Sequence, residues 1–172
     1  MISQGLIESI LRRYTLPPGG THGLPHWARV LENGRRLSRA TGARPHVVEL
    51  FAVFHDCQRT NEGIDDGHGR RGAGFAWELR GADYELGEED FRLLIKACDL
   101  HTEGYIDGDI TLQACWDADR LDLGRVGITP RPEKLCTVAA KDPRFLKWAV
   151  ARGERLFLPA FVSAEWGVRL TV

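Results

Sequence analysis

The chain has 172 residues, and its 43% hydrophobic and 27% charged residues are ordinary fractions for a soluble globular protein. Its 23 basic and 24 acidic residues leave a net charge of −1, so no overall positive field attracts nucleic acid or an anionic membrane. The longest uninterrupted apolar run, residues 156–162 (LFLPAFV), contains a proline and is too short to span a bilayer.

The N-terminal segment and the cysteines both bear on the cellular compartment. Residues 1–13 (MISQGLIESILRR) contain no basic start followed by an apolar signal core, so they do not indicate export. The cysteines form no C-x-x-C pair, and we expect them to be reduced and mostly buried as small hydrophobic residues. A cytoplasmic protein is the simplest interpretation. The four cysteines are Cys57, Cys98, Cys115 and Cys136.

Hydrophobic residues recur at helical spacing along most of the chain. Leu6, Ile7 and Ile10 predict a helix over residues 3–14, and the prolines and glycines of residues 15–20 end it. Proline is a good first residue of a helix, so two further helices are expected to begin near residues 25 and 45 and to end near residues 41 and 54. Later helices are predicted at about 69–79, 88–101, 111–123 and 143–156, separated by loops or turns at 58–67, 105–109 and 127–134.

The absence of other patterns defines the fold class. No useful length of sequence alternates with a period of two residues, and no internal repeat or low-complexity stretch is present. No segment has the composition of a linker. The sequence therefore predicts an all-α bundle formed by one domain over residues 1–172, with a core of tryptophans that includes Trp27, Trp77 and Trp148.

Histidines are concentrated where the predicted helices begin and end. Helix ends can converge at one end of a bundle, and bundles build metal sites from side chains on facing helices. Imidazoles and carboxylates without thiolates suit Fe, Mn, Co, Ni or Zn better than a structural cysteine–zinc site does. The six histidines are His22, His26, His46, His55, His68 and His101.

His55 and Asp56 stand together directly after the apolar run LFAVF. One interpretation is a polar helix end, in which the aspartate takes part in a local turn. The other is that both side chains hold one metal ion. The order of the surrounding motifs favours the second interpretation.

Three motifs occur in a specific order. His26 lies in HWARV, the His55–Asp56 pair lies in FHDCQR, and Asp119 lies in DADRLDLGRVGI. This order of H-x-x-R-V, H-D and A-D-R-L-D resembles the HD superfamily of metal-dependent phosphohydrolases. The resemblance covers about residues 20–130 and implies an all-α HD-type domain, with the helix and tail at about 143–172 outside the motif-bearing core.

The resemblance also implies four metal ligands: His26, His55, Asp56 and Asp119. Asp117 is the alternative to Asp119 as the last ligand. Two residues on a helix that are two positions apart point about 200° apart, so only one of these aspartates should face the metal. His22 is expected to support the site or to face solvent, because Gly23 indicates that the helix has not yet begun.

Binuclear members of the superfamily have two further histidines between the H-D pair and the last aspartate. His68 precedes Gly72–Ala73, and His101 ends a predicted helix, as such ligands do. The alternative is that His68 only begins a helix and that His101 only ends one, where a positive ring suits the helix dipole. The loop over residues 57–67 is short for a binuclear member. The expected cofactor is therefore one or two divalent ions per chain, with Mn, Fe, Co, Ni, Mg and Zn as candidates.

The activity implied by the resemblance is hydrolysis of a nucleotide or another small phosphorylated metabolite by a metal-activated water. Asp56 would hold the metal with one oxygen and orient the water with the other. Guanidinium groups bind phosphate well, so Arg59 and Arg71 are candidate phosphate ligands, although arginines in a loop can also serve only solubility. The alternatives are a non-catalytic sensor of metal or nucleotide, and a di-iron oxygenase that requires both His68 and His101. We expect no nucleic-acid or membrane partner, and His46 should lie at the surface.

Overall fold

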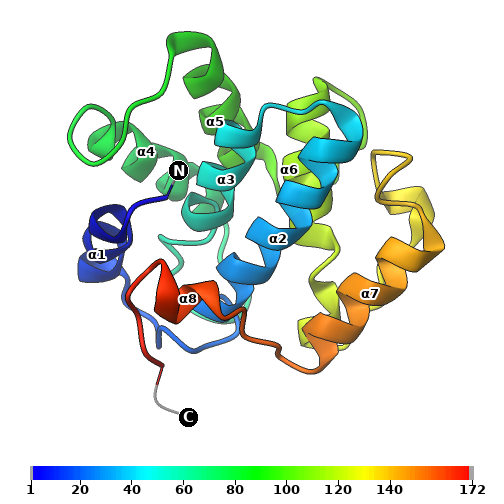
Figure 1. Ribbon diagram of the computed structural model, residues 1–172. Coiled ribbons are helices and arrows are strands. Elements are labelled where there is room, and N and C mark those ends of the chain that lie inside the picture. The colour runs from blue at the N-terminus through cyan, green and yellow to red at the C-terminus, as the bar shows by residue number, and fades with distance from the viewer. Residues whose placement is uncertain (1, 171–172) are drawn as a thin grey trace.

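The computed structural model describes residues 2–170, and within this range every regular element is a helix apart from one isolated bridge between Arg80 and Tyr84. The all-α prediction is confirmed (Figure 1). The α-helices are α1 (Gln4–Arg13), α2 (Leu24–Thr41), α3 (Pro45–Phe54), α4 (His68–Leu79), α5 (Glu88–Leu100), α6 (Ile110–Arg120), α7 (Pro143–Glu154) and α8 (Phe161–Ala164), with short 3-10 helices η1 (Leu123–Val126) and η2 (Pro132–Lys134).

Local signals explain where the helices begin. The side chain of Ser3 accepts a hydrogen bond from the backbone of Leu6 at the start of α1, and Asp109 and Asp142 cap α6 and α7 in the same way. Prolines occupy the first turns of α2 and α3, as expected. The helices η1, η2 and α8 were not predicted, because elements of three or four residues are too short to show a hydrophobic period.

Helix α3 lies in the middle of the molecule, with α1 and α4 on one side and α7 on the far side of α2 (Figure 1). It packs against α2, α5 and α6, while α4 packs against α5. Seven of its ten residues are buried, so the helix is apolar on nearly all sides. The His55–Asp56 pair follows α3 directly and is therefore placed in the interior of the molecule.

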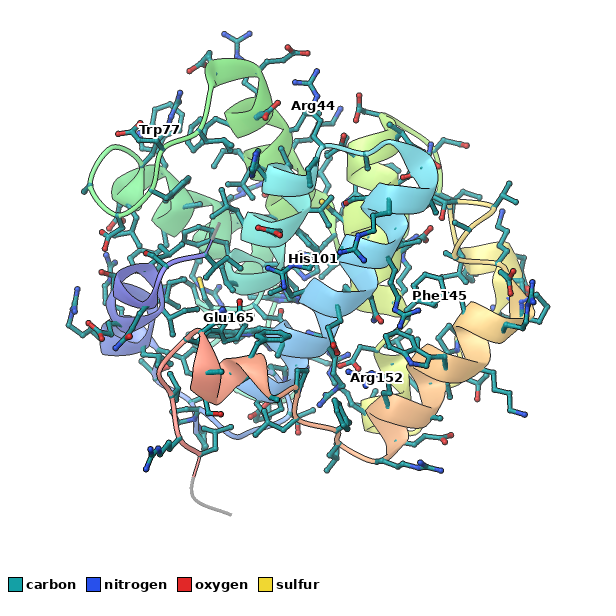
Figure 2. All side chains as sticks on the ribbon, in the orientation of Figure 1. Arg44, Trp77, His101, Phe145, Arg152 and Glu165 are labelled. Atoms are coloured by element: carbon teal, nitrogen blue, oxygen red, sulfur yellow. The ribbon has the colours of Figure 1, made fainter. Side chains whose placement is uncertain are left out.

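The three tryptophans that were predicted to pack in the core differ in their burial. Trp27 is completely buried and Trp148 is half-buried, but Trp77 is 67% exposed. Figure 2 shows Trp77 at the periphery, where it packs on one side against Phe91 with ring centroids 5.2 Å apart. The prediction of a core position for Trp77 was therefore wrong, because the residue packs against α5 on one side only and its other side is exposed.

Three of the cysteines, Cys57, Cys98 and Cys115, are buried, and Cys136 is half-buried. Burial raises the pKa of the Cys98 and Cys115 thiols well above the usual value, so these side chains behave as small hydrophobic residues, as predicted. Among residues 2–170, no helix is both long enough and apolar enough to cross a lipid bilayer.

Candidate metal centre

The predicted site residues converge from the ends of five helices. His26 lies in the first turn of α2, and Asp119 lies in the last turn of α6. His55 and Asp56 directly follow α3, His68 is the first residue of α4, and His101 directly follows α5. Figure 2 shows His101 near the centre of the molecule. All of the predicted ligand side chains are buried except that of Asp119, which keeps 17% of its surface exposed.

The first cluster contains the four ligands that the motifs predicted. The Nε2 atoms of His26 and His55 are 3.0 Å apart. Oδ2 of Asp56 lies 3.4 and 3.6 Å from these two nitrogens, and Oδ1 of Asp119 lies 3.4 and 3.7 Å from them. Two imidazole nitrogens and two carboxylate oxygens thus surround one small volume, which is a donor set that a divalent ion accepts.

The second cluster is formed by His68, His101 and the other oxygen of Asp56. The Nε2 atoms of the two histidines are 2.9 Å apart, and they lie 3.0 and 3.7 Å from Oδ1 of Asp56. This oxygen is buried and accepts no hydrogen bond among the described residues. Asp56 therefore presents one oxygen to each cluster, and both clusters could bind a metal ion.

The protonation of the four rings shows why a cation fits here. Each Nδ1 faces an oxygen that can only accept a hydrogen bond, so in a neutral ring Nδ1 carries the proton and Nε2 carries a lone pair. Two lone pairs that face each other at 3.0 Å in the first cluster cannot form a hydrogen bond, whereas a cation between them satisfies both. In the second cluster the two Nε2 atoms are 2.9 Å apart, and Nη1 of Arg59 also lies 3.1 Å from Nε2 of His68. The Nδ1 partners are Asp122 Oδ2 for His26, Phe51 O for His55, Asp65 O for His68 and Cys98 O for His101.

The electrostatics keep His55 and the two carboxylates of the first cluster in the forms that bind metals, whereas the pKa of His101 is raised because Asp56 outweighs burial. Burial lowers the pKa of His55 to about 3, so this ring is neutral near pH 7. Burial would raise the pKa of Asp119, but the neighbouring His55 and His26 lower it to about 2. The pKa of Asp56 is held well below its usual value in the same way, because His55 and the other histidines outweigh burial. Both carboxylates are therefore ionised.

Asp122 and Arg29 support the first cluster, and the sequence analysis missed both. Nδ1 of His26 donates a hydrogen bond of 2.7 Å to Asp122, and the Arg29 guanidinium donates two more, of 2.7 and 3.0 Å. A carboxylate behind a ligating histidine fixes its tautomer and its orientation. The available signal was spacing: Arg29 follows His26 by three positions and so shares a face of α2 with it, and Asp122 follows Asp119 by three positions within the helix predicted at 111–123.

The structure places Asp119, and not Asp117, beside the histidines. The buried carboxylate of Asp117 accepts hydrogen bonds from the backbone of Cys136 and from the backbone and hydroxyl of Thr137, at 2.7 to 2.8 Å. Asp117 therefore anchors the segment that follows η2, on the opposite face of α6 from the clusters. His46 is exposed, as expected, at the start of α3.

His22 lies beside the first cluster without joining it. Its ring centroid is 6.2 Å from that of His26, and its Nδ1 is hydrogen bonded to Glu62. This position agrees with the expected supporting role. Helix α2 begins at Leu24, so His22 and His26 do not form an H-x-x-x-H pair on one helix.

Of the arginines, Arg59 and Arg125 lie next to the clusters. Nη1 of Arg59, which is buried, is 3.5 Å from Oδ1 of Asp56 and 3.1 Å from Nε2 of His68. Nη1 of Arg125 is 4.0 Å from Oδ1 of Asp119, and the sequence analysis did not single out this residue. Arg71 instead donates hydrogen bonds to the backbone and to Asp65 within the loop that precedes α4, so it holds that loop in place.

Two glycines allow α4 to approach its neighbours closely. A Cβ atom at Gly69 would overlap the carbonyl oxygen of Cys98 and crowd the His101 ring, and one at Gly72 would overlap the carbonyl oxygen of Phe54. Because both positions lack a side chain, α4 brings His68 against His101 despite the short loop at 57–67. The loop therefore does not prevent His68 from turning inward.

Comparison of the chain with protein-family models, with curated protein sequences and with solved structures found no match.

Proposed function

We propose that the protein is a metal-dependent phosphohydrolase of the HD type that acts on a nucleotide or another small phosphorylated metabolite. The observation that carries this proposal is the position of Asp56, whose two oxygens each face a pair of histidine Nε2 atoms. The order of the motifs around His26, the His55–Asp56 pair and Asp119 agrees with it. Such an arrangement would place two metal ions side by side, as in the two-metal sites of phosphatases.

A divalent ion bound by these residues would polarise a phosphoryl oxygen and lower the pKa of a bound water. Side chains of the protein would orient the attacking water and exclude bulk water. When only the first cluster holds an ion, Oδ1 of ionised Asp56 can accept a hydrogen bond from the attacking water and so orient it. Burial of His26 and His55 excludes bulk water from one side of the reacting group.

Arg59 and Arg125 supply positive charge on two sides of the clusters. Their Nη1 atoms lie 3.5 Å from Asp56 and 4.0 Å from Asp119. A phosphoryl group that reaches the clusters would lie within reach of both guanidinium groups, which form strong hydrogen bonds with phosphate oxygens. In this proposal they take the phosphate-binding role first assigned to Arg59 and Arg71. All three guanidinium nitrogens of Arg71 donate within its own loop, whereas Arg59 donates to that loop only through Nε and Nη2 and directs Nη1 toward Asp56.

A di-iron oxygenase is the second candidate, because His68 and His101 form a second cluster around Asp56. Such an enzyme would cleave a C–C or C–P bond and would consume oxygen. Measuring oxygen uptake by the iron-loaded protein in the presence of phosphonates distinguishes this activity from hydrolysis.

The hydrolase proposal is tested by incubating the Mn-loaded protein with a panel of nucleotides, sugar phosphates and other phosphorylated metabolites. We expect release of inorganic phosphate from at least one compound, and loss of that release in Asp56→Asn. His46→Asn is the matched control, because His46 is exposed and lies outside both clusters. Equal turnover by Asp56→Asn and the unchanged protein would contradict the assignment of the site.

A further inference from the structure

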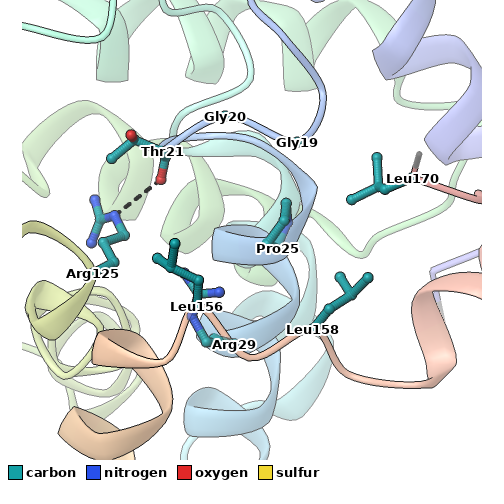
Figure 3. A pocket seen from close by; sticks show the side chains of 9 residues that line it. All are labelled: Gly19, Gly20, Thr21, Pro25, Arg29, Arg125, Leu156, Leu158 and Leu170. Atoms are coloured by element: carbon teal, nitrogen blue, oxygen red, sulfur yellow. Dashed lines mark hydrogen bonds between the residues drawn. The ribbon is translucent and has the colours of Figure 1, made fainter. Parts of the chain in front are cut away.

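A cavity of ≈ 440 Å³ opens on the side of the molecule where residues 19–21 face the segment that follows α7. Figure 3 shows Arg125 reaching toward Thr21, with Leu156 drawn between Arg125 and Leu158 and with Arg29 below Leu156. The volume lies in the range of small-molecule binding sites. The cavity therefore combines two cationic groups with apolar walls.

Arg125 connects this cavity with the candidate metal centre. Arg125 lines the cavity, and its Nη1 is 4.0 Å from Oδ1 of Asp119. The Asp119 side chain is 17% exposed, whereas His26, His55 and Asp56 are at most 3% exposed at their side chains. The first cluster thus opens to its surroundings at Asp119, next to Arg125.

Arg125 keeps hydrogen-bonding capacity for a ligand. Its Nε donates to the carbonyl oxygen of Thr21 at 3.2 Å, and its Nη1 donates to that of Asp122 at 3.3 Å. The carboxylates of Asp119 and Asp122 lie 4.0 and 3.9 Å away, which is too far for a hydrogen bond. Its Nη2 donates to no group among residues 2–170, so an anion can occupy that position.

Leu156 and Leu158 form the apolar wall of the cavity, and the backbone of Leu156 has an unfavourable conformation. Leu156 follows α7 with φ at 49°, and Phe157 donates a backbone hydrogen bond to Arg152, which is the usual geometry of a helix end. Glycine normally occupies this left-handed position. The side chain of Leu156 is also 61% exposed, so neither backbone preference nor burial within the fold explains a leucine here.

Hydrogen bonds connect the segment that carries this apolar wall with the candidate metal centre. The carbonyl oxygen of Phe157 accepts a hydrogen bond of 3.0 Å from Arg29, and Arg29 also binds Asp122. Asp122 in turn accepts the Nδ1 hydrogen of His26. A continuous chain of hydrogen bonds therefore sets the distance between the leucine wall and the first cluster.

We propose that this cavity binds the organic part of the substrate, that Arg125 binds its phosphate, and that the preferred substrates are phosphate esters with an apolar body, such as aryl esters, over sugar phosphates. The inference rests on the proposed function and adds the substrate class. Leu156 and Leu158 would cover an apolar group but would leave sugar hydroxyls without hydrogen-bond partners, which disfavours a polyol.

The test measures binding of phenylphosphonate and of inorganic phosphate to the Mn-loaded protein by calorimetry. In Leu156→Gly we expect the affinity for phenylphosphonate to fall about tenfold and that for inorganic phosphate to stay unchanged. The same variant should raise the thermal midpoint of the metal-free protein by about 2–4 °C, because glycine relieves the left-handed strain. A purely structural leucine would not move binding and stability in opposite directions.

Arg125→Gln should weaken both ligands, and Val138→Gly, at an 88% exposed residue outside the cavity, should change neither affinity. An unchanged affinity of Leu156→Gly for phenylphosphonate would overturn the inference, even if the unchanged protein releases phosphate from esters. If phosphate release is absent but Leu156→Gly selectively loses phenylphosphonate, the proposed hydrolase function fails and the binding cavity stands.

Discussion

Nδ1 of His26 lies 2.7 Å from Oδ2 of Asp122, and this contact determines which nitrogen of the ring faces the candidate metal centre. Because the carboxylate only accepts hydrogen bonds, it keeps the proton on Nδ1 and leaves the lone pair of Nε2 toward His55. Burial would raise the pKa of Asp122, but His26 and Arg29 lower it, so the carboxylate remains ionised. Asp122, which is not one of the predicted metal ligands, thus determines the tautomer of His26, which is one of them.

Asp122→Asn should lower metal affinity by about 10–100-fold while all four ligands of the first cluster remain. The amide carries no charge and can present a donor to His26, which removes the preference for one tautomer. The same change leaves Arg29 buried without its anion, so we expect the free energy of unfolding to fall by about 3–5 kcal/mol. Isothermal titration with Mn and urea unfolding measure the two effects.

The double variant Arg29→Met with Asp122→Asn separates these effects. Replacing the buried guanidinium should restore most of the stability, because no unpaired charge remains. It should not restore metal affinity, since His26 still lacks its carboxylate. Recovery of both quantities together would show that Asp122 acts only through the folding of α2 and η1.

Asp119→Asn and Asp117→Asn should differ in their effects on the bound metal content and on stability. Asp119→Asn removes a carboxylate from the first cluster and should lower the bound metal content. Asp117→Asn weakens the bonds to Cys136 and Thr137, so it should cost on the order of 2–3 kcal/mol of stability and keep the metal. Elemental analysis beside urea unfolding checks both, and the reverse ranking of metal content would make Asp117 the ligand.

The second cluster predicts the metal stoichiometry. The protein saturated with Mn or Fe should bind two ions per chain, and His68→Ala and His101→Ala should each bind one, because each removes one nitrogen from the cluster around Oδ1 of Asp56. Elemental analysis of the three proteins measures this directly. One ion in all three would leave a mononuclear site and would exclude the di-iron oxygenase.

The close approach of α4 to α5 predicts that a methyl group at Gly69 is enough to disturb the second cluster. Gly69→Ala should push α4 away from Cys98 and His101, which lowers the stoichiometry from two ions to one and destabilises the protein. Gly74→Ala is the matched control on the same helix, because a Cβ atom there meets nothing within 4 Å. We expect it to keep both ions, and loss of an ion in both variants would point to a general effect on α4.

Removal of the metal should make stability depend on pH. Burial lowers the pKa of His55 from 6.5 to about 3, so between these values the unfolded chain binds a proton that the folded chain does not. Asp119, lowered from 3.8 to about 2, loses its stabilising contribution as the pH falls through that lower range. The raised pKa of His101 has the opposite sign: its contribution is complete below 6.5 and is lost as the pH rises through the raised value.

Between about pH 6.5 and pH 4 the lowered pKa values of His55 and His22 set the slope, because Asp119 titrates below this range and the raised pKa of His101 acts above it. We therefore expect the free energy of unfolding of the chelator-treated protein to fall as the pH is lowered from about 6.5 to about 4. His55→Asn should flatten this dependence, whereas His46→Asn, at an exposed position, should not. Urea unfolding at several pH values in the presence of a chelator measures the slopes. Identical slopes in His55→Asn and the unchanged protein would show that another group carries the proton.

Much of the fold could be predicted from the sequence, because its signals are local. The hydrophobic period, the caps at Ser3, Asp109 and Asp142 and the prolines at the starts of α2 and α3 all act within one or two turns. The order of the motifs likewise named His26, His55, Asp56 and Asp119, all of which the structure brings together.

The choices that remained open depended on contacts between distant segments. Only the packing of α6 decides that Asp119 faces the histidines and that Asp117 faces Thr137, since the sequence does not say which side of a helix meets which neighbour. The approach of α4 through Gly69 decides that His68 reaches His101. The hydrogen bond between Arg29 and Asp122 joins residues 93 positions apart, and no local periodicity in the sequence indicates such a contact. Helical periodicity specifies the faces of each helix, but the direction in which a face points is a property of the whole assembled core.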